Sequence, residues 1–155
     1  MTNEIMLSLA KGVGYAAIGM AAIGSAIGAG IAGQAAIGAW KKCYAQGKAA
    51  PFLLLAMVGA PLSQTIYGML MMIFITGKAT AAFTSNTALD LAVYISVGIL
   101  GGLAQMISAI LQGKAAACGC VAFAETNQGF ANYFVVLGVI ETCAIFALVF
   151  SLMVL

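Results

Sequence analysis

Four long apolar runs restrict the folds open to this chain. They cover residues 12–40, 52–76, 88–120 and 131–155. Each run is long enough to cross a hydrocarbon core about 30 Å thick as a helix, which takes roughly 20 residues. Only 6% of the residues are charged and the mean hydropathy is +1.12, which is the composition of an integral membrane protein. We predict an all-α membrane protein with four transmembrane helices.

Short polar connections, residues 41–48, 77–87 and 125–129, separate these runs and leave no room for a soluble domain between them. We expect no removable signal peptide, because the first residues carry Glu4 in place of a basic cluster. Lysines at or toward the first and third connections outnumber those opposite: Lys41, Lys42, Lys48 and Lys114 against Lys11 and Lys78. By the positive-inside rule, the first and third connections face the cytoplasm.

Two motif types in the chain do not point to a cofactor. The cysteines Cys43, Cys118, Cys120 and Cys143 lack zinc spacing and form no C-x-x-C pair, and the sequence contains no histidine. The G-x-G-x-x-G pattern that begins at Gly28 lies inside an apolar helix and lacks the preceding strand of a dinucleotide fingerprint. A net charge of +2 without a basic face gives no basis for nucleic-acid binding.

The chain contains an internal repeat. Residues 27–36 align with residues 107–116, and Gln64-Thr65 aligns with Glu141-Thr142. Each unit crosses the membrane twice, so the two copies share one orientation. We predict two fused helical hairpins, residues 1–80 and residues 81–155. The first copy has glutamine where the second has glutamate, so one chain carries one ionisable site.

Small residues recur every four positions on one face of the first helix: Gly24, Gly28, Ala32 and Ala36. Small side chains let helix backbones approach closely in membranes. The stripe is equally compatible with packing inside one four-helix bundle and with packing between neighbouring subunits.

Glu141 is the residue that most strongly indicates a function. It is the only acidic residue of the last apolar run and lies roughly 15 Å from the start of that helix, near the middle of the membrane. A carboxylate at this depth is costly and marks a functional site by default. We predict that the protein handles a cation inside the membrane.

Polar side chains on two other helices are predicted to lie at the depth of Glu141. Gln112 and Glu141 are almost equally far from the turn near Asn127, so an antiparallel hairpin brings them together. In the second helix, one face carries four residues at i, i+3, i+4 and i+7 spacing: Ala60, Ser63, Gln64 and Tyr67. Pro61 predicts a kink there that frees backbone oxygens.

These groups suit a dehydrated cation. A proton needs little more than the carboxyl group, whereas a hard cation needs several oxygens in place of its water. Ser63, Gln64, Gln112 and Glu141 offer such oxygens, and Tyr67 can hold the carboxylate in place. Hydrogen bonding between helices without ion binding is the alternative.

Three segments of the chain resemble a known family. They are P-L-S-Q-T-I-Y-G from Pro61, L-Q-G-K-A-A-A from Leu111 and I-E-T-C-A-I from Ile140. Together they resemble the membrane rotor subunit of V-type ATPases, the sixteen-kilodalton proteolipid or c/K subunit, in its bacterial sodium-pumping form. The resemblance implies a Na⁺ site made of a backbone carbonyl, a hydroxyl, two amides and a carboxylate: Ala60, Ser63, Gln64, Gln112 and Glu141. It also implies that Tyr67 bonds the glutamate.

The same resemblance implies a homo-oligomeric ring in the lipid of a bacterial plasma membrane. The stator, formed by the a/I subunit, would supply a basic residue to the emptied Glu141, and a central-stalk subunit would connect the ring to the ATP-hydrolysing subunits. The chain itself would be non-catalytic. An H⁺-carrying version of the rotor is the first alternative. A small four-helix cation or multidrug transporter and a structural proteolipid or pore are less favoured.

Overall fold

The computed structural model describes residues 2–155, and the regular structure within this range is entirely helical. The elements are α1 (Asn3–Ala45), α2 (Leu54–Gly59), the short 3₁₀ helix η1 (Ala60–Leu62), α3 (Ser63–Thr84), α4 (Leu91–Thr126) and α5 (Phe130–Val154). α2, η1 and α3 follow one another without a break, so the chain forms four rods. Each rod is long and apolar enough to cross a membrane. The predicted all-α fold class is confirmed.

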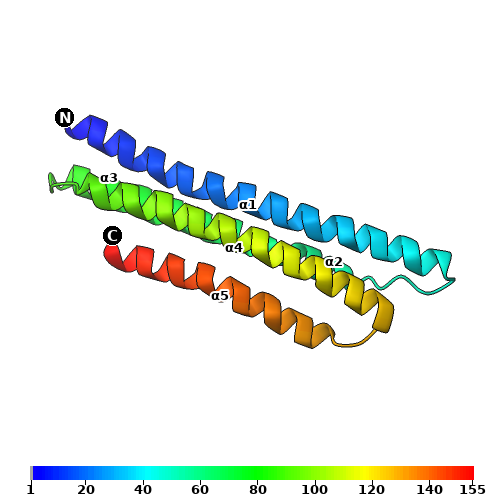
Figure 1. Cartoon of the computed structure of the whole chain (residues 1–155). Coiled ribbons are helices and arrows are strands. Elements are labelled where there is room, and N and C mark those ends of the chain that lie inside the picture. Colours follow the sequence, from blue (N-terminus) through cyan, green and yellow to red (C-terminus); the bar gives the residue numbers. More distant parts are fainter. Residues whose placement is uncertain (1) are drawn as a thin grey trace.

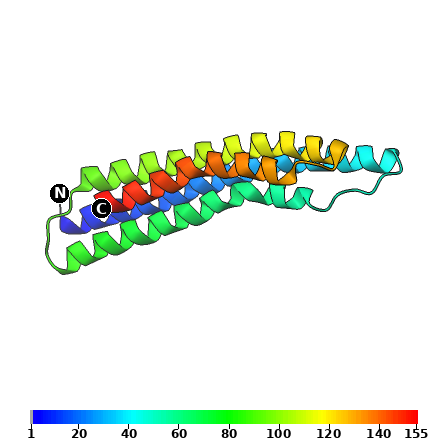
Figure 2. The ribbon, with the colours of Figure 1, turned by 90° about the horizontal axis from the view of Figure 1, so that it is seen from below.

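The four rods form two hairpins that run in the same sense. The N-terminus, the C-terminus and the α3–α4 connection lie at one end of the molecule, and the α1–α2 and α4–α5 connections lie at the other (Figures 1 and 2). α1 therefore runs parallel to α4, and α3 runs parallel to α5. The salt bridge between Lys42 and Glu125, 2.6 Å long, joins the two hairpins at the end that holds the first and third connections.

The helices extend beyond the apolar runs. α1 begins at Asn3 and continues to Ala45, and α3 continues to Thr84, although the second connection was predicted to begin at residue 77. The helical backbone bonds to itself regardless of side-chain polarity, so the end of an apolar run marks the edge of the hydrocarbon rather than the end of a helix. The predicted helix limits were too short here.

A 3₁₀ turn interrupts the second rod at the place where the sequence predicts a kink. Pro61 lies in η1, between α2 and α3, and has no backbone N–H to donate. The turn leaves the Ala60 carbonyl within 3.1 Å of the Ser63 hydroxyl. The kink thus places a backbone oxygen beside the polar face of α3.

The small-residue stripe packs inside the chain. A Cβ added at Gly24 would meet the backbone of Met106 at 2.5 Å, and one added at Gly28 would meet the Ala109 carbonyl of α4. Ala32 and Ala36 are buried as well. The stripe therefore joins α1 to α4. All four rods also expose large apolar side chains, among them Ile37, Ile66, Leu100 and Val139.

Candidate cation site

Glu141 lies near the middle of α5 and is partly buried. Its carboxylate accepts two hydrogen bonds, one on each oxygen. The Tyr67 hydroxyl donates to Oε1 at 2.6 Å, and the Gln112 amide donates to Oε2 at 3.2 Å. Hydrogen bonds to a charged group are the stronger kind, so α3 and α4 together fix the position of the acid.

Gln112, on α4, is fully buried and uses both ends of its amide. Its nitrogen donates to Glu141 and also to the Leu137 carbonyl at 3.0 Å. Its oxygen accepts a hydrogen bond of 3.0 Å from the Gln64 nitrogen. Gln112 thus connects the acid on α5 to the amide on α3.

Gln64, in the first turn of α3, is also fully buried. Its nitrogen points to α4, where it bonds Gln112 and the Ser108 hydroxyl. Its oxygen accepts from the Ser63 hydroxyl at 3.2 Å, and the same hydroxyl lies 3.1 Å from the Ala60 carbonyl. The Ser63 hydroxyl has one hydrogen for these two acceptors. The oxygens of Ala60, Ser63 and Gln64 therefore lie together with only one hydrogen to share.

All six residues named from the sequence thus belong to one hydrogen-bonded network. It runs from Ala60 and Ser63 through Gln64 and Gln112 to Glu141, with Tyr67 at its far end. Ser108 and the carbonyls of α5 are members that the sequence reasoning missed. Ser108 was detectable, because it precedes Gln112 by one helical turn and lies on the same face.

In the part of the chain that the structure describes, no basic side chain pairs with Glu141. Among residues 2–155 the salt bridge between Lys42 and Glu125 is the only ion pair, and it lies at one end of the helices. The same stretch of chain contains no cluster of three or more His, Cys, Asp or Glu side chains. One carboxylate among neutral amide, hydroxyl and carbonyl oxygens suits a hard monovalent cation or a proton.

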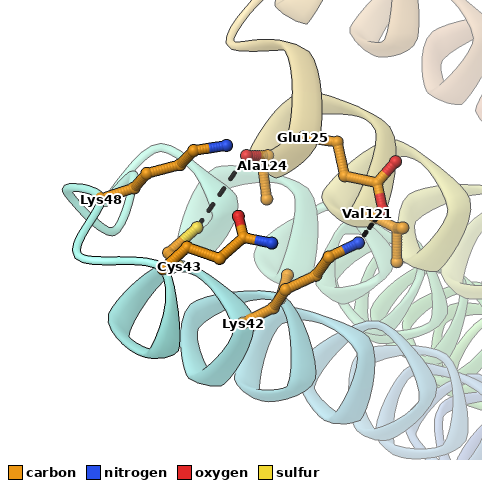
Figure 3. A pocket seen from close by; sticks show the side chains of 8 residues that line it. Lys42, Cys43, Lys48, Val121, Ala124 and Glu125 are labelled. Atoms are coloured by element: carbon orange, nitrogen blue, oxygen red, sulfur yellow. Dashed lines mark hydrogen bonds and ion pairs between the residues drawn. The ribbon is translucent and has the colours of Figure 1, made fainter.

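A separate cavity of about 210 Å³ opens between the C-terminal ends of α1 and α4 (Figure 3). The paired side chains of Lys42 and Glu125 line it, and the Cys43 thiol lies 3.9 Å from the Ala124 carbonyl. Lys48 reaches toward the same space from the α1–α2 connection (Figure 3). No member of the Glu141 network lines this cavity.

The cysteines form no disulfide bond among residues 2–155. All four are free thiols; Cys43 and Cys120 are buried, and Cys118 and Cys143 are exposed. The G-x-G-x-x-G pattern that begins at Gly28 lies wholly within α1 and does not follow a strand, as the sequence predicts.

The fold and the site together define a multi-pass membrane protein in which hydrogen bonds from two other helices hold the Glu141 carboxylate. Residues 95–154, which contain Glu141, match the family described as the C subunit of ATP synthase. The chain is also 36% identical over 156 residues to the K subunit of the A-type ATP synthase of Methanocaldococcus jannaschii. The aligned region takes in 100% of this chain and 64% of that relative, so the chain spans just under two thirds of the relative's length. The chain is thus similar to membrane subunits of ATP synthases, over residues 95–154 to the C subunit and over its whole length to an A-type K subunit.

Proposed function

We propose that this protein is the ion-carrying subunit of the membrane rotor of an A/V-type ATPase and that it moves Na⁺ by binding it at Glu141. The observation that carries the proposal is the position of Glu141. It lies near the middle of a membrane-spanning helix, bonded by Tyr67 and Gln112, without a basic side chain to neutralise it in residues 2–155. A cation or a proton is then the partner that the acid requires.

The mechanism follows from the cost of charge in lipid. A carboxylate paired with Na⁺ or a proton is neutral and can face the bilayer, whereas a bare carboxylate cannot do so cheaply. Loaded subunits therefore rotate past lipid. Emptied subunits stop where another subunit offers a basic residue, and ions exchange there. Rotation and ion flux become coupled.

The surface of the chain supports assembly into a homo-oligomeric ring. Large apolar side chains are exposed along α1, α3, α4 and α5, where lipid or neighbouring copies must cover them. The family that residues 95–154 match forms rings. In the proposed assembly the a/I stator supplies the basic residue, a central-stalk subunit turns with the ring, and ATP is hydrolysed by separate subunits. The ring lies in the plasma membrane, with the first and third connections on the cytoplasmic side.

Na⁺ is preferred over H⁺ because the network offers more oxygens than a proton needs. The Ala60 carbonyl, the Ser63 hydroxyl and the Gln64 amide oxygen meet at the kink, and both amide nitrogens point away from them. Together with the Glu141 carboxylate they supply the ligands that a dehydrated cation requires. Coordination by Gln112 would require its oxygen to share or leave its bond with Gln64.

Labelling of Glu141 by a hydrophobic carbodiimide tests the proposal, because this reagent attacks protonated carboxyl groups. Purified membranes are labelled with and without NaCl across a pH series, and Glu141→Gln marks the labelled site. Protection by NaCl at fixed pH supports the sodium rotor. Labelling that depends on pH alone assigns the chain to the proton-carrying version. Failure to co-purify with ATP-hydrolysing subunits would contradict the rotor assignment itself.

A further inference from the structure

Ser108 lies at the centre of the network, although its side chain does not bond Glu141. It is on α4, one turn before Gln112, and is 6% exposed. Its hydroxyl donates to the Ile140 carbonyl of α5 at 3.2 Å and accepts a hydrogen bond of 3.3 Å from the Gln64 nitrogen of α3. Three helices therefore meet at one hydroxyl.

The direction of these two bonds is determined by chemistry. A hydroxyl has one hydrogen, and a carbonyl oxygen can only accept. Because the hydrogen of Ser108 goes to Ile140, the side of Ser108 that faces Gln64 is an acceptor. Gln64 must present its NH₂ group there.

A second acceptor holds Gln64 in the same orientation. Gln112 uses its nitrogen for the Leu137 carbonyl and for Glu141, so its oxygen is the group that faces Gln64. Ser108 and Gln112 together take both hydrogens of the Gln64 amide. The Gln64 oxygen is then left on the opposite side, toward Ser63. A flipped amide would set its oxygen against two acceptors in a buried space, which is costly.

We propose that Ser108 is a positioning residue for cation binding: it holds the Gln64 amide so that the Gln64 oxygen, and not its nitrogen, faces the oxygens of Ser63 and Ala60. The inference rests on the proposed Na⁺ function of this site and adds a residue to it. Ser108 acts through Gln64 and leaves the carboxylate of Glu141 untouched. A loss of Ser108 therefore weakens the cation site without altering proton uptake by the acid.

The experiment measures carbodiimide labelling of Glu141 in assembled membranes against NaCl concentration and, separately, against pH without sodium. Ser108→Ala should raise the half-protecting NaCl concentration about tenfold, the size expected for one buried hydrogen bond. The pH at which half of Glu141 is labelled without sodium should not change. Ser108→Thr keeps the hydroxyl and should restore protection. Thr142→Ala removes a hydroxyl that bonds only its own helix, at Gly138, and should change neither readout.

Two further variants separate positioning from general loosening of the bundle. Ser108→Cys fills the site with a somewhat larger thiol that accepts hydrogen bonds weakly, so it should reproduce the loss of protection even where Ser108→Ala fails to assemble. Adding Ser108→Ala to Gln64→Ala should cause no further loss, because the side chain that Ser108 orients is already gone.

The outcomes distinguish the two proposals. The role of Ser108 is overturned if NaCl protects Ser108→Ala and Ser108→Cys as well as it protects the wild type. It is also overturned if the pH profile shifts as much as the sodium dependence does. In both cases protection of the wild type by NaCl still supports the sodium rotor. A wild type that NaCl does not protect overturns the sodium function, and the role of Ser108 falls with it.

Discussion

The Tyr67 hydroxyl donates a 2.6 Å hydrogen bond to Glu141, and this bond joins the first helical hairpin to the second. Tyr67 lies on α3 and Glu141 on α5, so the acid of one hairpin is held by the other. A neutral donor at this distance stabilises the carboxylate without cancelling its charge. The acid stays available for a cation while its position is restrained.

Removal of this hydroxyl should therefore weaken cation binding. We expect Tyr67→Phe to raise the NaCl concentration that half-protects Glu141 by about tenfold or more, because hydrogen bonds to charged groups contribute about 1.5–3 kcal/mol. The measurement is carbodiimide labelling at fixed pH. Tyr15→Phe removes the hydroxyl of an exposed tyrosine on α1 and should leave protection unchanged. Equal protection in Tyr67→Phe and the wild type would show that the bond does not hold the site.

Replacement of the acid itself should stop transport. Glu141→Gln keeps the size of the side chain and removes the charge that attracts the cation, so ring assembly should persist while ATP-driven Na⁺ uptake into vesicles falls to background. Glu125→Gln removes the exposed acid at the end of α4 and should retain uptake. Normal uptake by Glu141→Gln would refute the rotor proposal.

The two buried amides should be needed for sodium affinity. Gln64→Ala and Gln112→Ala each remove hydrogen bonds that orient the network and leave buried partners unsatisfied, so we expect the half-protecting NaCl concentration to rise at least about tenfold. Gln128→Ala changes an exposed glutamine in the α4–α5 connection and serves as the control. Unchanged sodium dependence in both buried variants would favour protons as the transported ion.

The sequence could predict the principal residues of the network because membrane depth and helical spacing are both readable from it. Gln112 and Glu141 are almost equally far from the turn near Asn127, which places them side by side. In the structure the Gln112 amide nitrogen lies 3.2 Å from a carboxylate oxygen of Glu141. Helical spacing places Ser63, Gln64 and Tyr67 on one face of the second rod, and all three belong to the network. The division into units of residues 1–80 and 81–155 stays a prediction.

Other parts of the site could not be predicted in this way. The carbonyls of Leu137 and Ile140 are backbone groups, and no residue type reveals which of them accept a side-chain bond. Which atom of each glutamine faces its neighbour depends on partners from three helices at once. The ends of α1 and α3 were misplaced because a change from apolar to polar side chains does not end a helix.

Glycines allow the close contact between α1 and α4, and Gly28 and Gly113 on its two sides supply the last prediction. A Cβ at Gly28 would meet the Ala109 carbonyl and lie 3.0 Å from Pro61, and one at Gly113 would meet the backbone of Gly28. Gly28→Ala must therefore push α1 away from α4, and overpacking of this kind costs about 1–3 kcal/mol.

Gly30 offers a matched control on the same helix, because a Cβ there has nothing within 4 Å. We expect Gly28→Ala to lower the thermal unfolding midpoint of the detergent-purified protein and Gly30→Ala to leave it unchanged or raise it, since alanine favours helices more than glycine does. Pro61, which would also be displaced, borders the kink that carries Ala60 and Ser63. Gly28→Ala should therefore weaken sodium protection of Glu141 as well. Equal stability of the two alanine variants would show that α1 and α4 can separate freely.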